Sequence, residues 1–177
     1  IESLAYGGDG VGHIDGRVVF VPDGVPGDVV SCTITERRDS FFRGDIEHIV
    51  YPSPDRVERF CPLADRCGGC QWQAVAYPVQ LSWKETIIRE TLSRIGKIDF
   101  PVSPCIPCDE LRGYRTVARY PCRMTRQGLV MGYHERRSRR LVDVDTCPVA
   151  VEGINSIAAS FRTCAADFPR LQPREVT

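Results

Sequence analysis

Short apolar runs separated by glycine- and proline-rich turns fill the first third of the chain. Strands are predicted over residues 16–22, 27–35 and 41–50, which are rich in β-branched and aromatic residues and bounded by Gly or Pro. Because a small barrel is a common way to close several short strands, residues 1–57 are predicted to form an OB-like β-barrel. Residues 51–56 contain two prolines, which disfavour helix in the residues before them, and are predicted to form a stiff linker.

Two later segments have the spacing of an amphipathic helix. The first covers residues 78–95, where Pro78 suits the first turn and Gly96 suits the C-cap. Its apolar stripe is predicted to pack in the core and consists of Leu81, Ile88, Leu92 and Ile95. The second covers residues 151–168, where the helical period is carried by Ile154, Ile157, Ala158, Phe161, Ala165 and Phe168.

Between these two helices the pattern alternates again, which predicts a small antiparallel sheet. Its strands are expected over residues 114–123, 129–134 and 140–147, with a turn at 125–128. Alternate positions of a strand share one face, so the first strand should present three arginines together: Arg115, Arg119 and Arg123. Pro121 marks an edge strand or a bulge. The fold class is therefore predicted as α+β, with residues 58–177 forming a second domain.

Charge is segregated along the chain although the net charge is zero. Residues 112–140 contain nine arginines, no lysine and one acid, Glu135, so this stretch carries +8. Arginine forks two donors onto a phosphate and stacks on bases, which favours a nucleic-acid partner. A solvated rim of arginines paired with acids elsewhere is the alternative. The chain has no run of 18 apolar residues, so no membrane-spanning helix and no membrane partner are expected.

Nine cysteines, an odd number, favour a reduced, cytoplasmic protein with a metal site over a secreted disulfide scaffold. Cys61, Cys67 and Cys70 have the spacing C-x5-C-x2-C. Zinc sites usually use two close pairs of ligands, whereas iron–sulfur clusters often use clustered cysteines plus a distant one. The pattern therefore favours an iron–sulfur cluster. Gly68 and Gly69 would let backbone N–H groups approach the cluster sulfides.

Two candidates exist for the fourth ligand. Cys147 follows a predicted strand and precedes a proline. Cys105 and Cys108 form a C-x2-C pair that could join Cys67 and Cys70 in a zinc ribbon, but the gap of 34 residues exceeds the roughly 12–20 of familiar ribbons. The remaining cysteines sit singly in apolar patterns and are predicted to be buried small hydrophobes: Cys32, Cys122 and Cys164.

The chain resembles the N-terminal part of the RNA uracil-5-methyltransferase family over nearly its whole length. Residues 1–30 resemble the TRAM domain, an OB-fold RNA-binding module, and residues 53–73 resemble the iron–sulfur motif. Residues 77–96 resemble the helix that follows, while "GYRTVAR" (113–119) and "RLVDVDTCPV" (140–149) resemble a strand and the last ligand of the central domain. The resemblance implies a [4Fe–4S] cluster on Cys61, Cys67, Cys70 and Cys147. Joining Cys70 to Cys147 would close a loop of more than seventy residues, which suits a structural role for the cluster.

The resemblance also implies an enzyme. Family members continue into a domain that binds S-adenosylmethionine and carries a catalytic cysteine and a general base, and none of these is visible in this sequence. In the implied reaction the cysteine thiolate adds to uracil C6, C5 takes the methyl group, and loss of the C5 proton expels the cysteine. The chain is therefore expected to be the RNA-handling portion of an rRNA or tRNA uracil-C5 methyltransferase, without catalytic residues of its own.

The resemblance places RNA contacts in the arginine-rich stretch. Arg119 is the first candidate, with Arg115 beside it on the predicted strand face. Tyr133 is either a base-stacking aromatic or a core residue. Phosphate contacts are expected from one predicted turn, at Arg136, Arg137, Arg139 and Arg140. Arg17 and Arg43 are further candidates in the barrel.

Two other classes of function stay open at this point. A zinc-bound nucleic-acid adaptor without enzymatic activity would use the same cysteines and arginines. A ferredoxin-like electron carrier would use the cluster, but a long basic stretch and a barrel do not suit that role. The structured RNA partner is not identified further by the sequence, and no oligomeric state is predicted.

Overall fold

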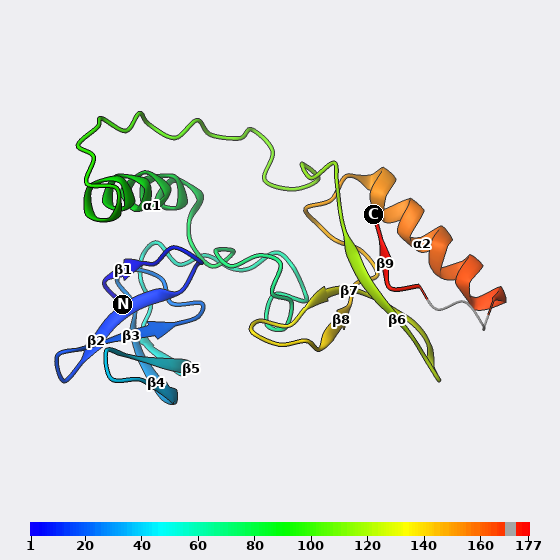
Figure 1. Cartoon of the computed structure of the whole chain (residues 1–177), viewed down its shortest axis with the longest axis horizontal. Helices are drawn as coiled ribbons and strands as arrows, with labels where there is room; N and C mark the ends of the chain where they lie inside the picture. The colour runs from blue at the N-terminus through cyan, green and yellow to red at the C-terminus, as the bar shows by residue number, and fades with distance from the viewer. Residues whose placement is uncertain (169–172) are drawn as a thin grey trace. The chain divides into compact units, whose positions relative to one another are not determined.

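The structure is a computed structural model that describes residues 1–168 and 173–177 (Figure 1). The chain divides into two compact units. Unit 1 comprises Ile1–Arg59 and Gln71–Pro107, and unit 2 comprises Phe60–Cys70 and Cys108–Thr177. The N-terminal sheet and the helix that was predicted for the second domain thus belong to the same unit. Neither helix in the described part of the chain combines the length and apolarity needed to cross a bilayer.

Unit 1 contains a five-stranded sheet with the order β1-β2-β3-β5-β4. Its strands are β1 (Ser3–Leu4), β2 (Gly10–Ile14), β3 (Arg17–Val21), β4 (Val29–Arg37) and β5 (Phe41–Tyr51). The three strands predicted from the sequence are confirmed as β3, β4 and β5. β3 pairs with β5 in parallel and the other pairs are antiparallel. The predicted closed barrel is not seen, because among the described residues β1 and β4 form the two ends of the sheet order.

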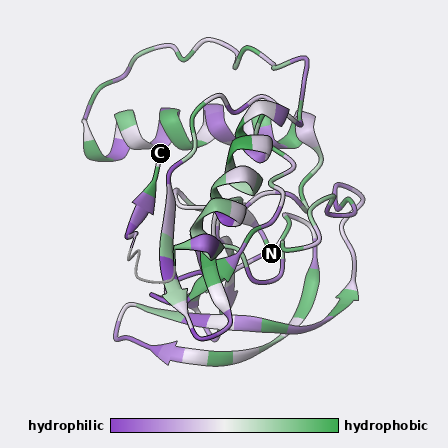
Figure 2. Ribbon diagram, turned by 90° about the vertical axis from the view of Figure 1, so that its right-hand side faces the viewer, coloured by the Kyte–Doolittle hydropathy of each residue, from purple (hydrophilic) through white to green (hydrophobic). Residues whose placement is uncertain are grey.

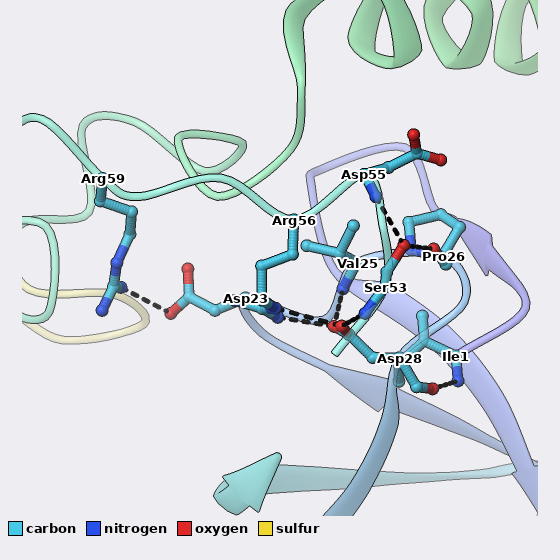
Figure 3. A network of polar contacts seen from close by, with 9 residues as sticks. All are labelled: Ile1, Asp23, Val25, Pro26, Asp28, Ser53, Asp55, Arg56 and Arg59. Atoms are coloured by element: carbon cyan, nitrogen blue, oxygen red, sulfur yellow. Dashed lines mark hydrogen bonds and ion pairs between the residues drawn. The ribbon is translucent and has the colours of Figure 1, made fainter. Parts of the chain in front are cut away.

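The segment after β5, predicted as a linker, is held against the rest of unit 1 by a buried carboxylate (Figure 3). The side chain of Asp28 is buried and accepts hydrogen bonds from the amides of Val25 (2.7 Å) and Ser53 (2.9 Å). Arg56 donates to the same carboxylate from Nε (3.1 Å) and Nη2 (2.6 Å). Burial acts to raise the pKa of Asp28, but the donors from Arg56, Ser53 and Val25 outweigh it and lower the pKa.

Helix α1 (Tyr77–Glu90) continues into a π-helical turn, η1 (Thr91–Ile95), which confirms the first predicted helix. Trp72, Val79 and Trp83 pack against a buried cluster made by Leu4, Val25, Ala74 and Val75. The predicted burial of the Leu81 stripe is wrong, because Ile88 is 51% exposed and Ile95 is 80% exposed. The helix instead contacts the core through its first turns, where Val79 and Trp83 lie.

Unit 2 contains a four-stranded antiparallel sheet with the order β8-β7-β6-β9 and helix α2 (Glu152–Asp167). The strands are β6 (Tyr120–Thr125), β7 (Gly128–His134), β8 (Leu141–Asp143) and β9 (Glu175–Val176). Its first core cluster consists of Ala118, Tyr120, Cys122, Met131 and Ala158, with Ile154 and Phe161 of α2 packed against it. Figure 2 shows hydrophilic and hydrophobic residues mixed along the strands and the helices.

The strand predicted over 114–123 begins only at Tyr120. Arg115 instead bridges to Ala150 in parallel, donating its amide to the carbonyl of Val149 at 2.8 Å. Of the three arginines expected on one strand face, only Arg123 lies in a strand, so that expectation is wrong. β6 is also an interior strand, because it lies between β7 and β9 in the sheet order.

Helix α2 is tied to the sheet by a largely buried arginine. The guanidinium of Arg162 donates to the carbonyl oxygens of Leu129 (3.1 Å), Met131 (2.7 Å) and Val144 (2.9 Å). It also donates to the carboxylate of Asp143 at 2.7 Å. These bonds satisfy carbonyl groups of β7 and of the segment after β8. They therefore fix α2 against the sheet.

Candidate functional site

All four candidate ligand cysteines lie in unit 2, three in the loop 60–70 and one after β8. Cys147 is buried in a hydrophobic cluster with Val142, Val144, Val149 and Ala150. Cys67 and Cys70 pack against this same cluster, together with Phe60 and Leu63 of the loop. The fold therefore brings Cys67 and Cys70 of the loop to the distant Cys147, across more than seventy residues of chain.

The cysteine loop is attached to the end of β7 through its backbone. Cys67 bridges to Glu135, and the amide of Gly68 donates to the carbonyl of His134 at 2.9 Å. A Cβ at Gly68 would lie 2.9 Å from that carbonyl oxygen, so this approach requires glycine. The Gly68 amide thus bonds to β7, while the Gly69 amide bonds to the sulfur of Cys67. The predicted approach of these amides to cluster sulfides stays a prediction.

Burial and two neighbouring thiols oppose ionisation of the Cys67 thiol. Burial raises the pKa of Cys67, and the neighbouring thiols of Cys61 and Cys147 raise it further. The Gly69 amide and the Arg136 guanidinium act in the opposite direction. Clustered thiols become thiolates when a cation binds among them, so this set of donors fits a soft metal group.

Two buried side chains hold Cys147. The Oδ1 atom of Asn155 accepts from the Cys147 amide at 2.9 Å, and its Nδ2 atom donates to the Cys147 carbonyl at 3.3 Å. The phenol of Tyr120 is buried and hydrogen-bonded to the Cys147 sulfur and to Tyr133; burial is the main cause of its raised pKa. Sequence reasoning missed Asn155, although a polar residue within the apolar face of a predicted helix was a signal.

Metal coordination itself stays a prediction. Over residues 1–168 and 173–177, no three His, Cys, Asp or Glu side chains already form a metal-binding arrangement. What supports the four-cysteine site is the shared packing of Cys67, Cys70 and Cys147, and the influence of Cys61 and Cys147 on the Cys67 thiol.

The other cysteines differ in environment. Cys105 belongs to unit 1, where its amide donates to the Glu85 carboxylate at 2.7 Å, whereas Cys67 and Cys70 belong to unit 2. The alternative of a zinc ribbon thus draws on two separate units. Of the three cysteines predicted to be buried, Cys122 is buried, Cys32 is half-buried and Cys164 is exposed, so the prediction is wrong for Cys164.

The candidate RNA-contacting residues divide into packed and exposed ones. Nη1 of Arg115 donates to the hydroxyl of Tyr133 at 3.4 Å, and this bond is the main cause of the raised pKa of Arg115. The Tyr133 ring lies 5.2 Å from that of Tyr120 and packs against both clusters of unit 2, which favours the core alternative. Arg119 has a 71% exposed side chain and forms an ion pair with Glu175 at 3.3 Å.

The four arginines between β7 and β8 lie in a turn, as predicted. Arg137 adopts a left-handed backbone conformation with φ of 52°. Arg139 and Arg140 are exposed, whereas Arg136 is half-buried beside Cys67. Glu135 forms an ion pair with Arg140 at 3.4 Å, so this single acid balances only part of the charge of the turn.

Comparison with known proteins places the chain. The family model of the TRAM domain matches residues 1–46. An uncharacterized RNA methyltransferase of Thermosynechococcus vestitus is 36% identical over 96% of this chain and 38% of the relative. One of Gloeobacter violaceus is 41% identical over 92% of this chain and 36% of the relative. The chain thus spans little more than a third of the length of these relatives.

A solved structure agrees with these relatives. The tRNA (uracil-54, C5)-methyltransferase of Pyrococcus abyssi, in complex with S-adenosyl-L-homocysteine, matches 86% of this chain and 32% of its own, with a TM-score of 0.51 and 25% identity. The TRAM match, the RNA methyltransferase relatives and this structural neighbour agree with the resemblance seen in the sequence. These findings fit the N-terminal part of the RNA uracil-5-methyltransferase family, with a TRAM domain at residues 1–46.

Proposed function

We propose that this chain is the RNA-recognition and iron–sulfur portion of an S-adenosylmethionine-dependent RNA uracil-C5 methyltransferase. The observation that carries the proposal is the convergence of the cysteine loop and Cys147 in one cluster of unit 2. The same unit contains the arginine-rich stretch 112–140. The similarity to RNA methyltransferases and to a tRNA uracil methyltransferase supports it.

The proposed metal group is a [4Fe–4S] cluster held by Cys61, Cys67, Cys70 and Cys147. Its bonds to the thiolates would add a structural tie between the loop and the segment after β8. In this chain Asn155 would orient the Cys147 peptide, and Gly69 would donate to the Cys67 sulfur. A structural role fits these contacts, since the sulfur atoms lie among packed side chains of unit 2.

RNA recognition is proposed for the arginines of unit 2. Arg119 would contact RNA directly, and Arg115 would act next to it, positioned by the hydroxyl of Tyr133. The turn arginines at 136, 137, 139 and 140 would contact phosphates. Because RNA is read specifically in single-stranded loops, the substrate is proposed to be an rRNA or tRNA loop with the target uridine. No residue of unit 1 or unit 2 is proposed to carry out methyl transfer from S-adenosylmethionine.

A zinc-bound adaptor is the second candidate, because four thiolates also suit a tetrahedral Zn²⁺ ion. It shares the RNA contacts and differs in the metal and in the absence of an enzyme. Metal analysis of anaerobically purified protein separates the two candidates, since only iron–sulfur protein contains acid-labile sulfide.

Binding of the chain to a transcribed tRNA and to an rRNA hairpin tests the RNA-binding part of the proposal. We expect log Kd to depend strongly on log salt concentration, and Arg119→Ala to reduce the slope by about 0.7–0.9 as one phosphate contact is lost. The matched control is Arg94→Ala, which removes an exposed arginine paired with Glu90 in unit 1.

If Arg119→Ala leaves both affinity and slope unchanged, Arg119 is not an RNA contact. If the wild-type chain binds neither RNA above the level of a neutral control protein, the proposed function is wrong for this chain. The enzymatic part requires a longer protein that contains this chain, incubated with the same RNAs and S-adenosylmethionine. Mass spectrometry of the RNA should then find 5-methyluridine.

A further inference from the structure

The arginines of the five-stranded sheet differ in how their charge is balanced. Nε of Arg38 lies 2.6 Å from the carboxylate of Glu36, and Arg43 lies 3.0 Å from Asp9 and 3.3 Å from Glu36. Arg17 and Arg37 form no ion pair with any acid in the described part of the chain. Arg17 of β3 and Arg37 of β4 are thus not neutralised, whereas Arg43 of β5 and Arg38, which follows the end of β4, are.

The strand register places Arg17 and Arg37 on one face of the sheet and Arg43 on the other. Phe42 of β5 lies opposite Val19 of β3 and opposite Arg37 of β4, so these three side chains share one face. Arg17 precedes Val19 by two positions in β3 and shares that face. Arg43 lies opposite Phe20 and so projects from the other face of the sheet.

Both unneutralised arginines cover one aromatic ring. The guanidinium carbon of Arg17 lies 5.2 Å from the centroid of Phe42, and that of Arg37 lies 5.7 Å from it. Both arginines are exposed, while the Phe42 ring is half-buried at the end of the face that contains buried Val19. Attraction to the ring orders both guanidiniums while leaving donors in solvent.

This arrangement suits an anion between or beside the two arginines. Two like charges held by one ring repel each other, and a bound phosphate would relieve that repulsion. Guanidinium planes bind phosphate through paired donors and stack on bases. The opposite face cannot offer the same site, because Asp9 and Glu36 neutralise the arginine there.

We propose that Arg17, Arg37 and Phe42 form a phosphate-binding clamp of unit 1 that holds the backbone of single-stranded RNA. The proposal rests on the RNA-handling function proposed above and adds a contact in unit 1 to those in unit 2. The RNA phosphate lies against the two guanidiniums, and an adjacent base stacks on a guanidinium plane. The ring of Phe42 acts as the platform that orders the arginines.

The test measures binding of the whole chain to a fluorescent single-stranded oligouridine at several salt concentrations. Arg17→Gln combined with Arg37→Gln should weaken binding about tenfold near physiological salt and lower the log–log slope by about 0.7 for each phosphate released. Arg17→Lys with Arg37→Lys should recover the slope but not the full affinity, because lysine keeps the charge without the stacking plane. The matched control is Arg38→Gln, which alters an exposed arginine already paired with Glu36.

Each result decides the proposal. Fluorescence of Trp72 and Trp83, the chain's two tryptophans, reports whether unit 1 of each variant stays folded, and the single variants replace the double one if it does not. A folded double variant that binds like wild type overturns the clamp, as does equal weakening by Arg38→Gln. Loss with Arg119→Ala but not with the double variant overturns the clamp alone. A wild-type chain that binds no RNA overturns both the clamp and the proposed function.

Discussion

At the scale of single residues, the peptide of Cys147 is fixed by one amide side chain. Asn155 both accepts from its N–H and donates to its C=O, at 2.9 and 3.3 Å. A buried Asn side chain that pairs with both the N–H and the C=O of one residue satisfies four polar groups that burial would otherwise leave unpaired. The position of the proposed fourth ligand therefore depends on α2, the helix that contains Asn155.

We expect Asn155→Leu to weaken metal retention, because leucine fills similar volume without either hydrogen bond. Residues that orient metal ligands typically change metal affinity about 10- to 100-fold when they are mutated. The measurement is the rate at which a chelator removes metal from the reconstituted chain. Ser156→Ala, at a neighbouring exposed position of α2, is the control and should behave as wild type. Equal rates for Asn155→Leu and wild type would show that Asn155 does not position the ligand.

At the scale of elements, the turn before β4 and the segment after β5 are joined by one buried ion pair. The Asp28 carboxylate receives both Nε and Nη2 of Arg56, and Nη2 also donates to the carbonyl of Asp23 at 2.6 Å. Residues 51–56, which the sequence indicated as a linker, thus complete the fold of unit 1. Removing one partner of such a buried ion pair is strongly destabilising, because the other charge is left buried and uncompensated.

Arg56→Met should destabilise unit 1 by about 3 kcal/mol at pH 7, because it leaves a buried carboxylate without its cation. In the wild type the lowered pKa of Asp28 means that its stabilisation is present above the ordinary value of 3.8 and is lost as the pH falls through the folded-state pKa. In the variant the carboxylate stays buried but loses the Arg56 donors, so protonation should remove the penalty as the pH is lowered from 7 towards 4.

Urea unfolding followed by the fluorescence of Trp72 and Trp83 measures this prediction, since both tryptophans pack in unit 1. The difference between variant and wild type should shrink on acidification. Arg59→Met, which breaks the more exposed pair with Asp23 at 3.6 Å, should cost under about 1 kcal/mol. A difference for Arg56→Met that is constant with pH would contradict the role of the Asp28 charge.

Elements defined by local patterns were predictable from the sequence. β3, β4, β5, β7 and α2 follow runs of alternating or helical period, and the turn at 125–128 follows from its glycine, which has a φ of 118°. Long-range partners were not predictable. Arg115 forms an isolated bridge with Ala150 outside the named strands. Which face of α1 is exposed depends on the residues that its first turns contact. Closure of the sheet likewise depends on pairing between strands far apart in sequence.

The candidate site shows the same division. The C-x5-C-x2-C spacing pointed to the cysteine loop, and the packing of Cys67 and Cys70 with Cys147 agrees with the choice of a distant partner. The pattern could not identify Asn155 or Tyr120, because their roles arise only when α2 and β6 pack beside the loop. It also placed Tyr133 equally well in the core and in contact with RNA, and its packing favours the core.

At the scale of the whole molecule, zero net charge hides one strongly basic segment. Residues 112–140 carry +8, and all of them lie in unit 2. Glu135 is the only acid within the segment, and Glu175 forms an ion pair with Arg119. Such a charge distribution favours association with a polyanion and a strong dependence of affinity on salt.

The metal and sulfide content of the chain tests the proposed iron–sulfur centre most directly. The measurement is the iron, zinc and acid-labile sulfide content of the chain after anaerobic purification, for wild type, Cys147→Ala and Cys105→Ala. We predict brown wild-type protein with about four iron and four sulfide per chain, retained by Cys105→Ala and lost or reduced in Cys147→Ala. Wild-type protein that contains zinc or no metal, or a Cys147→Ala variant with unchanged iron and sulfide, would contradict it.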